Sequence, residues 1–532
     1  MTATPDLAAA ASALDAAQAV VDAAVGVLAR DSIDARQVLA YEAAHAAAAV
    51  ATGRGLLDYA GKGDVEARIT CAFVADAVGE LAGRIFGREA EWGVEPGALD
   101  ATRGFLAEFR APELLASIAD GGPRHLDDDF ELVQDTFRRF AEKELAPIAE
   151  HIHRENADIP EEIISGLAEL GAFGLSIPTE YGGYGEGGEG EYIGMVVATE
   201  ELSRGSLGAG GSLITRPEIL ARALIAGGTE EQKKHWLPQL ASAEVMNAVA
   251  VTEPDYGSDV AGVKVTATPT DGGWLINGVK TWCTFGARAD VLLLLARTDP
   301  DRSKGHRGLS MFIVPKPRGE GHGFELTQEA GDGAPGGGKM EGRPIDTIGY
   351  RGMHSYEIAL DDWFVAAENL IGMEDGEGRG FYYQMAGFEN GRIQTAARAI
   401  GVMQAAYESA RQYALDRNVF GQPLADFQLT QAKLGRMAVL IQASRQFAYV
   451  VARLMADGKG QMEATLIKAY VCKAAEWVTR EAMQIHGGMG YAEEYDVSRY
   501  YVDARVLSIF EGADETLCTK VIARRLVADA TA

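Results

Sequence analysis

The residues best suited to chemistry lie near the C-terminus, in the stretch VLSIFEGADETL (506–517). Glu511 directly follows an apolar run that includes Ile509 and Phe510, and the run itself is typical of a strand. Apolar surroundings raise the pKa of a carboxyl above its ordinary value of about 4.3, which makes it a stronger base near neutral pH. The structural alternative is a helix cap, because an acid after an apolar run often marks a helix start.

Four other segments combine glycine with polar or aromatic side chains at the ends of predicted elements, which suits close contact with a ligand. They are VTEPDYGSD (251–259), KTWCTFG (280–286), DRNVFGQPL (416–424) and QIHGGMGY (484–491). Each segment alone is also consistent with a surface turn or a helix C-cap.

Taken together and in this order, the segments resemble the acyl-CoA dehydrogenase family. TEPDYGSD is similar to the family's TEPxxGSD loop, QIHGGMGY to its QxxGGxG(F/Y) motif and IFEGADE to its (Y/F)EGTxE motif. The resemblance covers roughly residues 125 to 530. It implies a flavoenzyme in which Glu511 removes the α-proton of an acyl-CoA thioester while the β-hydrogen leaves as a hydride to FAD.

A second position for the base has to be considered, because one subfamily carries it on a long helix immediately before an arginine. Here Gly391 precedes Arg392, and a glycine has no side chain that could accept a proton. Glu389 lies two residues earlier and is closer to the family's CoA-binding acid. Glu511 is therefore the only well-matched base.

The resemblance also implies a set of FAD contacts. Thr284 would bond near flavin N5, Trp282 would flank the ring, and Thr252 would contact the pyrimidine edge. The residues expected to contact FAD are Val249, Val251, Thr252, Trp282, Thr284, Arg417, Phe420, Gln428, Gln484 and Gly488. Those that hold the ADP part would act on the FAD of a neighbouring subunit, which implies at least a dimer: Arg417, Phe420, Gln484 and Gly488. Ala513 departs from the family's threonine, which puts one hydroxyl contact in doubt.

Within the family, the long N-terminal extension, the Gly-rich insertion and the stretch GRPIDTIGYRGMHSYE resemble the methylsuccinyl-CoA dehydrogenases. This implies oxidation of (2S)-methylsuccinyl-CoA to mesaconyl-CoA in the ethylmalonyl-CoA pathway, with electrons passing to electron-transferring flavoprotein. The alternatives are a short- or branched-chain acyl-CoA dehydrogenase, an oxidase of the same fold, and a non-catalytic assembly protein on this scaffold.

The residues expected to contact the substrate are Ser258, Glu389, Arg392 and Arg216. Arg216 is assigned to the second carboxylate of a dicarboxylic acyl group, because a buried anion needs a cation beside it. The alternative for Arg216 is a solvated arginine at a helix start before Pro217.

The elements that position these residues follow from the apolar periodicity. Residues 1–122 are Ala-rich and predict an extension of four or five helices, and residues 123–246 predict an N-terminal α domain. Over residues 247–372 apolar residues alternate with polar ones, a period of two, which predicts a β-domain. Asn277-Gly278 predicts a hairpin bend in this domain, and the glycines of residues 331–343 predict a flexible insertion. Residues 373–532 predict a C-terminal helical bundle.

The composition of the chain limits the kinds of binding partner and site that we expect. The 532-residue chain carries a net charge of −28, which disfavours nucleic acid and anionic membranes. Its four cysteines show no CxxC spacing, and His151 and His153 would face different sides of a helix, so we expect neither disulfides nor a metal site. The N-terminus lacks a basic segment typical of a signal peptide, and no uninterrupted apolar run is long enough for a membrane span. We expect a cytoplasmic protein.

Overall fold

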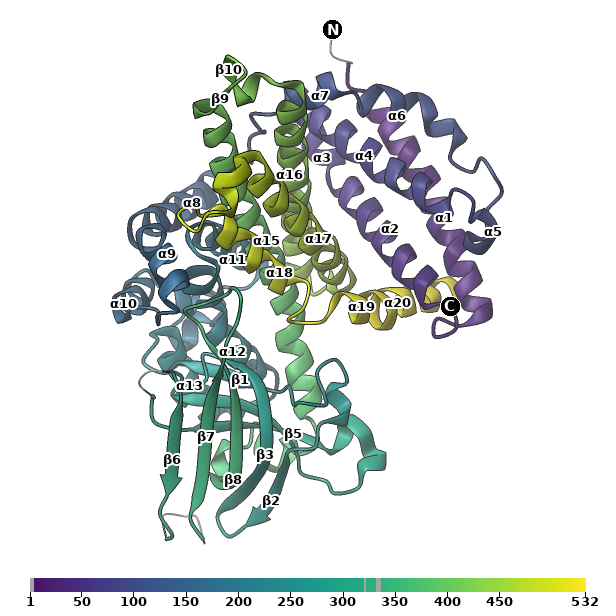
Figure 1. Cartoon of the computed structure of the whole chain (residues 1–532). Helices are drawn as coiled ribbons and strands as arrows, with labels where there is room; N and C mark the ends of the chain where they lie inside the picture. The colour runs from purple at the N-terminus through teal and green to yellow at the C-terminus, as the bar shows by residue number, and fades with distance from the viewer. Residues whose placement is uncertain (1–3, 320–321, 332–335) are drawn as a thin grey trace. The chain divides into compact units, whose positions relative to one another are not determined.

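The structure is a computed structural model that describes residues 4–319, 322–331 and 336–532, without the side chain of Glu389. The chain forms two compact units. Unit 1 comprises Met1–Thr136 together with Arg392–Ala532, and unit 2 comprises Phe137–Gly391. Each unit is described by itself below, with the element labels of Figure 1.

Unit 1 is helical. Its first part, the extension, contains α1 (Leu7–Asp31), α2 (Gln37–Gly55), α3 (Leu57–Ala60), α4 (Asp64–Ile85), α5 (Glu89–Trp92), α6 (Arg103–Phe109) and α7 (Pro112–Ser117). Its second part contains the end of α15 (Gly380–Asp416), the short hairpin β9 (Asn418–Val419) and β10 (Gln422–Pro423), α16 (Gln428–Ala456), α17 (Gln461–His486), α18 (Val497–Leu507), α19 (Asp514–Thr516) and α20 (Ala523–Thr531). The helix α8 (Asp128–Phe140) begins in unit 1 and ends in unit 2.

The extension packs against the C-terminal helices within unit 1, with α2 and α4 beside α16 and α17 (Figure 1). Small residues permit this close packing. A Cβ added at Gly435 on α16 would lie 2.0 Å from the carbonyl oxygen of Leu115, and one at Gly55 on α2 would lie 3.0 Å from Phe447. These backbones therefore approach more closely than any larger residue would allow.

Helix α1 is the one helix among the described residues that is long and apolar enough to cross a membrane, and half of its most apolar window is buried in the structure. Its buried positions, among them Leu14, Val21 and Leu28, recur at helical spacing, and the helix packs against α2 and α4. In the structure α1 serves as a core helix of the extension.

Unit 2 combines helices with one large sheet (Figure 1). Its helices are α9 (Ala146–Glu155), α10 (Glu161–Glu169), α11 (Gly188–Gly205), α12 (Thr215–Gly227), α13 (Glu230–Ala241) and α14 (Met373–Gly376). Its strands are β1 (Asn247–Ala250), β2 (Thr266–Thr270), β3 (Gly273–Thr284), β4 (Val291–Arg297), β5 (Leu309–Pro315), β6 (Phe324–Gln328), β7 (Gly338–Ile345) and β8 (Ser355–Ala366).

The strand order in this sheet is β1-β4-β2-β3-β8-β7-β6, with β5 paired to β4. Leu293 and Ile313, from β4 and β5, share a buried core with Leu220 and Leu224 of α12. Strand β3 pairs antiparallel with β8, so that Thr284 lies opposite Ser355 at one end of both strands. This pairing brings the side chains of Thr284 and Ser355 together in unit 2.

The predicted fold class is confirmed: helices, then a sheet, then helices, with an additional helical extension at the N-terminus. The stretch ADGGPRHLDDD (119–129), whose Gly, Pro and acidic residues predict a linker, lacks regular structure from residue 121 to residue 127.

Two local predictions are wrong. The bend at Asn277-Gly278 is absent, because β3 runs straight through it and Gly278 instead marks a register shift against β8; the chain turns earlier, at Gly272, whose φ is 78°. Much of the predicted insertion over 331–343 is strand β7, whereas residues 332–335 lie outside the described chain.

Candidate active site

The segment that carries Glu511 is a loop between α18 and α19. Helix α18 ends at Leu507, so the apolar run is a helix end and the strand-like interpretation is wrong. The backbone of Glu511 is left-handed with φ 52°, and Gly512 follows with φ 102°. Helix α19 begins at Asp514 with Ala513 at its N-cap, so the capping alternative for Glu511 is wrong as well.

A buried lysine supports this loop from α17. Lys468 Nζ donates to the carbonyl oxygens of Leu507 at 3.2 Å and Gly512 at 2.7 Å, on the two sides of Glu511. Burial lowers the pKa of Lys468, and these two carbonyl contacts satisfy two of its three donors. The loop backbone is thus tied to α17 at two points.

The carboxylate of Glu511 is held by two side chains of α15. Arg398 Nη2 donates to Oε1 at 2.7 Å, and Thr395 Oγ1 donates to Oε2 at 3.2 Å. The same Arg398 nitrogen donates to Thr395 Oγ1 at 2.9 Å, and its guanidinium lies 4.9 Å from the ring centre of Phe510. Arg398 is fully buried and the Glu511 side chain is 9% exposed. Such a charge-assisted pair fixes the direction of the carboxylate and favours its ionised form, which acts against the effect expected from apolar surroundings alone.

Neither Arg398 nor Thr395 was singled out from the sequence. A signal was present, since both lie in the segment IQTAARAI of a helix, where an arginine among small apolar residues implies a buried partner. Arg392, which was singled out, donates from Nη1 to Thr465 Oγ1 at 3.0 Å. The side chain of Glu389 lies outside the described part of the chain.

In unit 2, the ends of β3 and β8 bring together the residues expected at a flavin ring. Thr284 Oγ1 lies 3.1 Å from Ser355 Oγ. Trp282 has φ 57° next to a register shift between β3 and β8, and its side chain is 54% exposed. A large exposed indole beside a strand-end hydroxyl pair suits a planar, hydrogen-bonding ring.

The TEPDYGSD loop is anchored to the same strand through buried charges. Glu253 accepts hydrogen bonds from the amides of Lys264 and Val265, at 2.6 and 2.8 Å, and from Lys280 Nζ at 2.9 Å. The Thr281 amide donates to the carbonyl oxygen of Thr252 at 2.8 Å. Thr252 is thereby held next to the end of β3.

The other expected residues of unit 2 lie as follows. Val249 is half-buried on β1, Val251 is buried just after it, and Ser258 is exposed in the loop. Arg216 lies on α12 and is 6% exposed, with Nη2 3.4 Å from Thr215 Oγ1. The alternative of a solvated arginine is therefore wrong.

The residues expected to hold the ADP part of FAD are all exposed in unit 1. They are Arg417, Phe420, Gln484 and Gly488, and Gln428, another expected FAD contact, is exposed as well. Phe420 is 99% exposed at the β9–β10 turn, and a Cβ added at Gly488 would meet nothing within 4 Å. An exposed aromatic side chain can stack on a nucleotide and an open glycine permits close backbone approach, so the residues present are compatible with FAD.

Two groups among the described residues have a geometry that could hold a metal ion: His45, Asp514 and Cys518, and Asp158, His322 and His354. Burial raises the pKa of the Cys518 thiol, which disfavours the thiolate form, and the Lys473 ammonium lies 3.5 Å from Asp514. Burial alone would raise the pKa of Asp158, but the hydrogen bond from His354 holds that pKa below its ordinary value. Internal partners thus compete with a metal in both groups, and we propose none.

Comparison with known proteins identifies the family. Three family descriptions match: "Acyl-CoA dehydrogenase, N-terminal domain" over residues 127–244, the middle domain over 248–363 and the C-terminal domain over 378–527. The chain belongs to the acyl-CoA dehydrogenase family. It is accordingly an oxidoreductase of the acyl-CoA dehydrogenase type.

One curated relative is the (2S)-methylsuccinyl-CoA dehydrogenase of Cereibacter sphaeroides, 45% identical over 407 residues, which span 76% of this chain and 71% of the relative. A solved glutaryl-coenzyme A dehydrogenase in complex with glutaryl-CoA has a TM-score of 0.68 and 31% identity, with 76% of this chain and 96% of that chain covered. A glutaryl-CoA dehydrogenase of Mycobacterium smegmatis in complex with FADH2 has a TM-score of 0.64 and 25% identity, with 76% and 95% covered.

Proposed function

We propose that this acyl-CoA dehydrogenase binds FAD and oxidises (2S)-methylsuccinyl-CoA to mesaconyl-CoA, with Glu511 as the base that removes the α-proton. The observation that carries the proposal is the Glu511 carboxylate, held in a left-handed loop by Arg398 and Thr395. A buried, oriented carboxylate in a segment that matches the family's base motif is otherwise difficult to explain.

The proton transfer follows from this geometry. Arg398 and Thr395 direct the carboxylate and limit its rotation, which keeps the base in one orientation before substrate arrives. Glu511 accepts the proton from the α-carbon and becomes a neutral acid. The positive charge of Arg398 is then no longer balanced by a carboxylate. The buried guanidinium then favours release of that proton and return of the base to its ionised form.

The cofactor contacts would follow the roles that the family resemblance implies. Thr252, Trp282 and Thr284 would contact the ring, and Arg417 and Phe420 would contact the ADP part of the FAD of a neighbouring subunit. FAD supplies an acceptor for the hydride from the β-carbon when it is bound. Electron-transferring flavoprotein is the proposed next acceptor, in a cytoplasmic homo-oligomer.

The substrate assignment is supported by the 45% identity to a methylsuccinyl-CoA dehydrogenase and by the burial of Arg216. A dicarboxylic acyl group introduces a second carboxylate, and an unpaired buried anion costs several kcal/mol. The planar fork of an arginine can bind a carboxylate through two parallel hydrogen bonds. Arg216 is the proposed partner of this carboxylate.

Anaerobic titration of the purified protein against a panel of CoA esters tests the function. We expect a yellow protein with about one FAD per chain, whose flavin absorbance is bleached by (2S)-methylsuccinyl-CoA in preference to neutral branched esters of similar size. Reoxidation by electron-transferring flavoprotein but not by O2 would distinguish a dehydrogenase from an oxidase. Preference for neutral esters would remove the substrate assignment, and absence of FAD after reconstitution would remove the function.

A further inference from the structure

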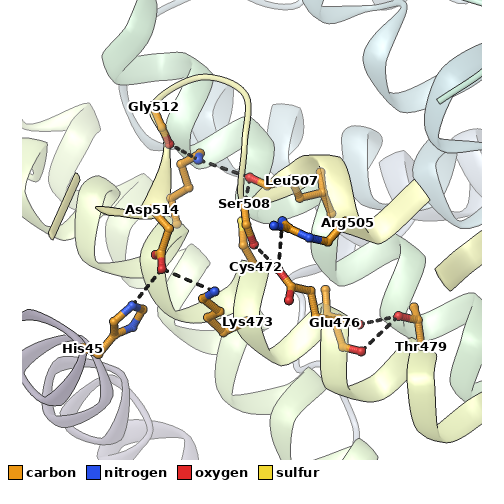
Figure 2. Close-up of polar contacts among 12 residues, drawn as sticks. His45, Cys472, Lys473, Glu476, Thr479, Arg505, Leu507, Ser508, Gly512 and Asp514 are labelled. Carbon is orange, nitrogen blue, oxygen red and sulfur yellow. Dashed lines mark hydrogen bonds and ion pairs between the residues drawn. The ribbon is translucent and has the colours of Figure 1, made fainter. Parts of the chain in front are cut away.

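The loop that carries Glu511 is also contacted by the N-terminal extension. Asp514, three residues after Glu511, accepts a hydrogen bond from Tyr41 Oη at 2.6 Å. It also accepts one from His45 Nε2 at 3.1 Å (Figure 2). Tyr41 and His45 lie four residues apart on α2, so their side chains project from the same face of the helix. Both residues belong to the part of the chain that precedes the three matched family domains.

The contact with Asp514 is buried and strongly polar. The Asp514 side chain is 4% exposed, and Lys473 of α17 is its third partner at 3.5 Å. Burial alone would raise the pKa of this carboxyl, but the bonds from His45 and Tyr41 and the charge of Lys473 lower it to about 2. Asp514 is therefore an anion that the extension helps to compensate, and removal of its partners would leave a buried charge poorly paired.

Besides α15, whose Arg398 and Thr395 hold the Glu511 carboxylate, α17 holds the rest of the loop. Lys468 binds the carbonyl oxygens of Leu507 and Gly512. The Ser508 hydroxyl donates to Glu476 at 2.5 Å (Figure 2). The segment from 507 to 514 is thus fixed by α15 and α17 of the C-terminal part and by α2 of the extension.

This fixation matters because the backbone of Glu511 is strained. A non-glycine residue is unfavourable in the left-handed region, and it persists there only where the surrounding structure determines it. After Glu511 the charged side chain of Asp514 anchors the loop. Two of its partners, Tyr41 and His45, come from α2, and the others are Lys473 and the Cys518 thiol, whose sulfur lies 3.9 Å away.

We propose that Tyr41 and His45 are positioning residues for the catalytic loop: by holding Asp514, they keep Glu511 in its left-handed conformation with its carboxylate against Arg398. This inference rests on the proposed role of Glu511 as the base. It assigns to the extension a part in catalysis, in addition to its packing on the C-terminal helices.

The test compares variants of α2 in the full-length holoenzyme. The double variant Tyr41→Phe/His45→Gln removes both donors to Asp514 while keeping side chains of similar size. The matched control is Glu42→Gln, which lies on the same helix and loses a 2.9 Å ion pair with Arg88 but has no contact with the loop. If the double variant does not accumulate as folded protein, Tyr41→Phe, which removes a single oxygen atom, takes its place.

Two readouts distinguish positioning from simple stability. We expect kcat for flavin reduction to fall about tenfold to a hundredfold in the double variant with KM within twofold, because a displaced base acts after substrate binding. The amide hydrogens of residues 508–516 should exchange with deuterium faster in this variant even without substrate. The control should show neither change.

Unchanged kcat in the double variant, or loop amides that exchange as in the wild type, would overturn the proposal. Equal losses in the double variant and in Glu42→Gln would also overturn it, since they would report only weaker packing of the extension. The exchange measurement needs no substrate, so it tests the loop even if wild-type protein oxidises no CoA ester, an outcome that would count against the proposed function instead.

Discussion

At the scale of residues, the site was partly predictable. Short sequence motifs shared with the family indicated Glu511, Thr252, Trp282 and Thr284. Such motifs can be found from the sequence because each one is continuous in the chain. They did not point to Arg398, because its link to Glu511 joins positions 113 residues apart in the chain. Only folding brings α15 beside the loop that follows α18.

The hydroxyl of Thr395 should contribute measurably to the orientation of the base. Thr395→Val keeps the shape but removes the donor to Glu511 Oε2. The net worth of one hydrogen bond is ~1 kcal/mol, so the rate constant for flavin reduction should fall about fivefold. Thr395→Ser, which keeps the hydroxyl, should stay close to wild type. An equal loss in both variants would mean that the methyl group, rather than the hydroxyl, matters.

Arg216 should discriminate between charged and neutral substrates. Arg216→Ala should lose transition-state stabilisation on methylsuccinyl-CoA worth about 2–5 kcal/mol, measured as kcat/KM, because one partner of a buried charge pair is gone. A neutral branched ester of similar size should lose much less. A similar loss on both esters would exclude Arg216 as the carboxylate partner.

At the scale of elements, apolar periodicity predicted the helices of the extension and the short strands of the sheet. It failed at Asn277-Gly278, where a turn sequence lies inside a continuous strand: pairing with β8 outweighs the local preference, and the irregularity is absorbed as a register shift. It also could not reveal how the extension docks, because that depends on close approaches such as the one at Gly435.

Docking of the extension should depend on Gly435. Gly435→Ala places a methyl group 2.0 Å from the Leu115 carbonyl oxygen, so α7 and α16 must separate. We expect a lower melting temperature and lower solubility as apolar surface becomes exposed, and deletion of residues 1–122 should do the same more strongly. Gly83→Ala on α4 is the control, because its Cβ would meet nothing within 4 Å, and it should be neutral or stabilising. A Gly435→Ala protein as stable as wild type would argue against tight docking.

At the scale of the whole molecule, exposed apolar residues of unit 1 support the expectation of an oligomer. Phe420 is 99% exposed, and nearby in the chain Leu429 is 70% exposed, which is unusual for large apolar side chains unless a partner covers them. Phe420→Asp should shift the protein towards monomers in light scattering and weaken retention of FAD on dialysis. Phe86→Asp, an equivalent change at a side chain 84% exposed in the extension, should affect neither. An unchanged oligomer and flavin content in Phe420→Asp would place the interface elsewhere.

The central claim is that Glu511 is the base, and the most direct measurement is anaerobic stopped-flow reduction of the flavin by (2S)-methylsuccinyl-CoA in wild type and Glu511→Gln. The amide keeps the shape and can still accept from Arg398, but it cannot accept the substrate proton. The account predicts that the variant retains FAD and binds the ester, while flavin reduction slows by about three orders of magnitude or more. Reduction within about tenfold of the wild-type rate would contradict the account and would make Glu389 the first alternative base.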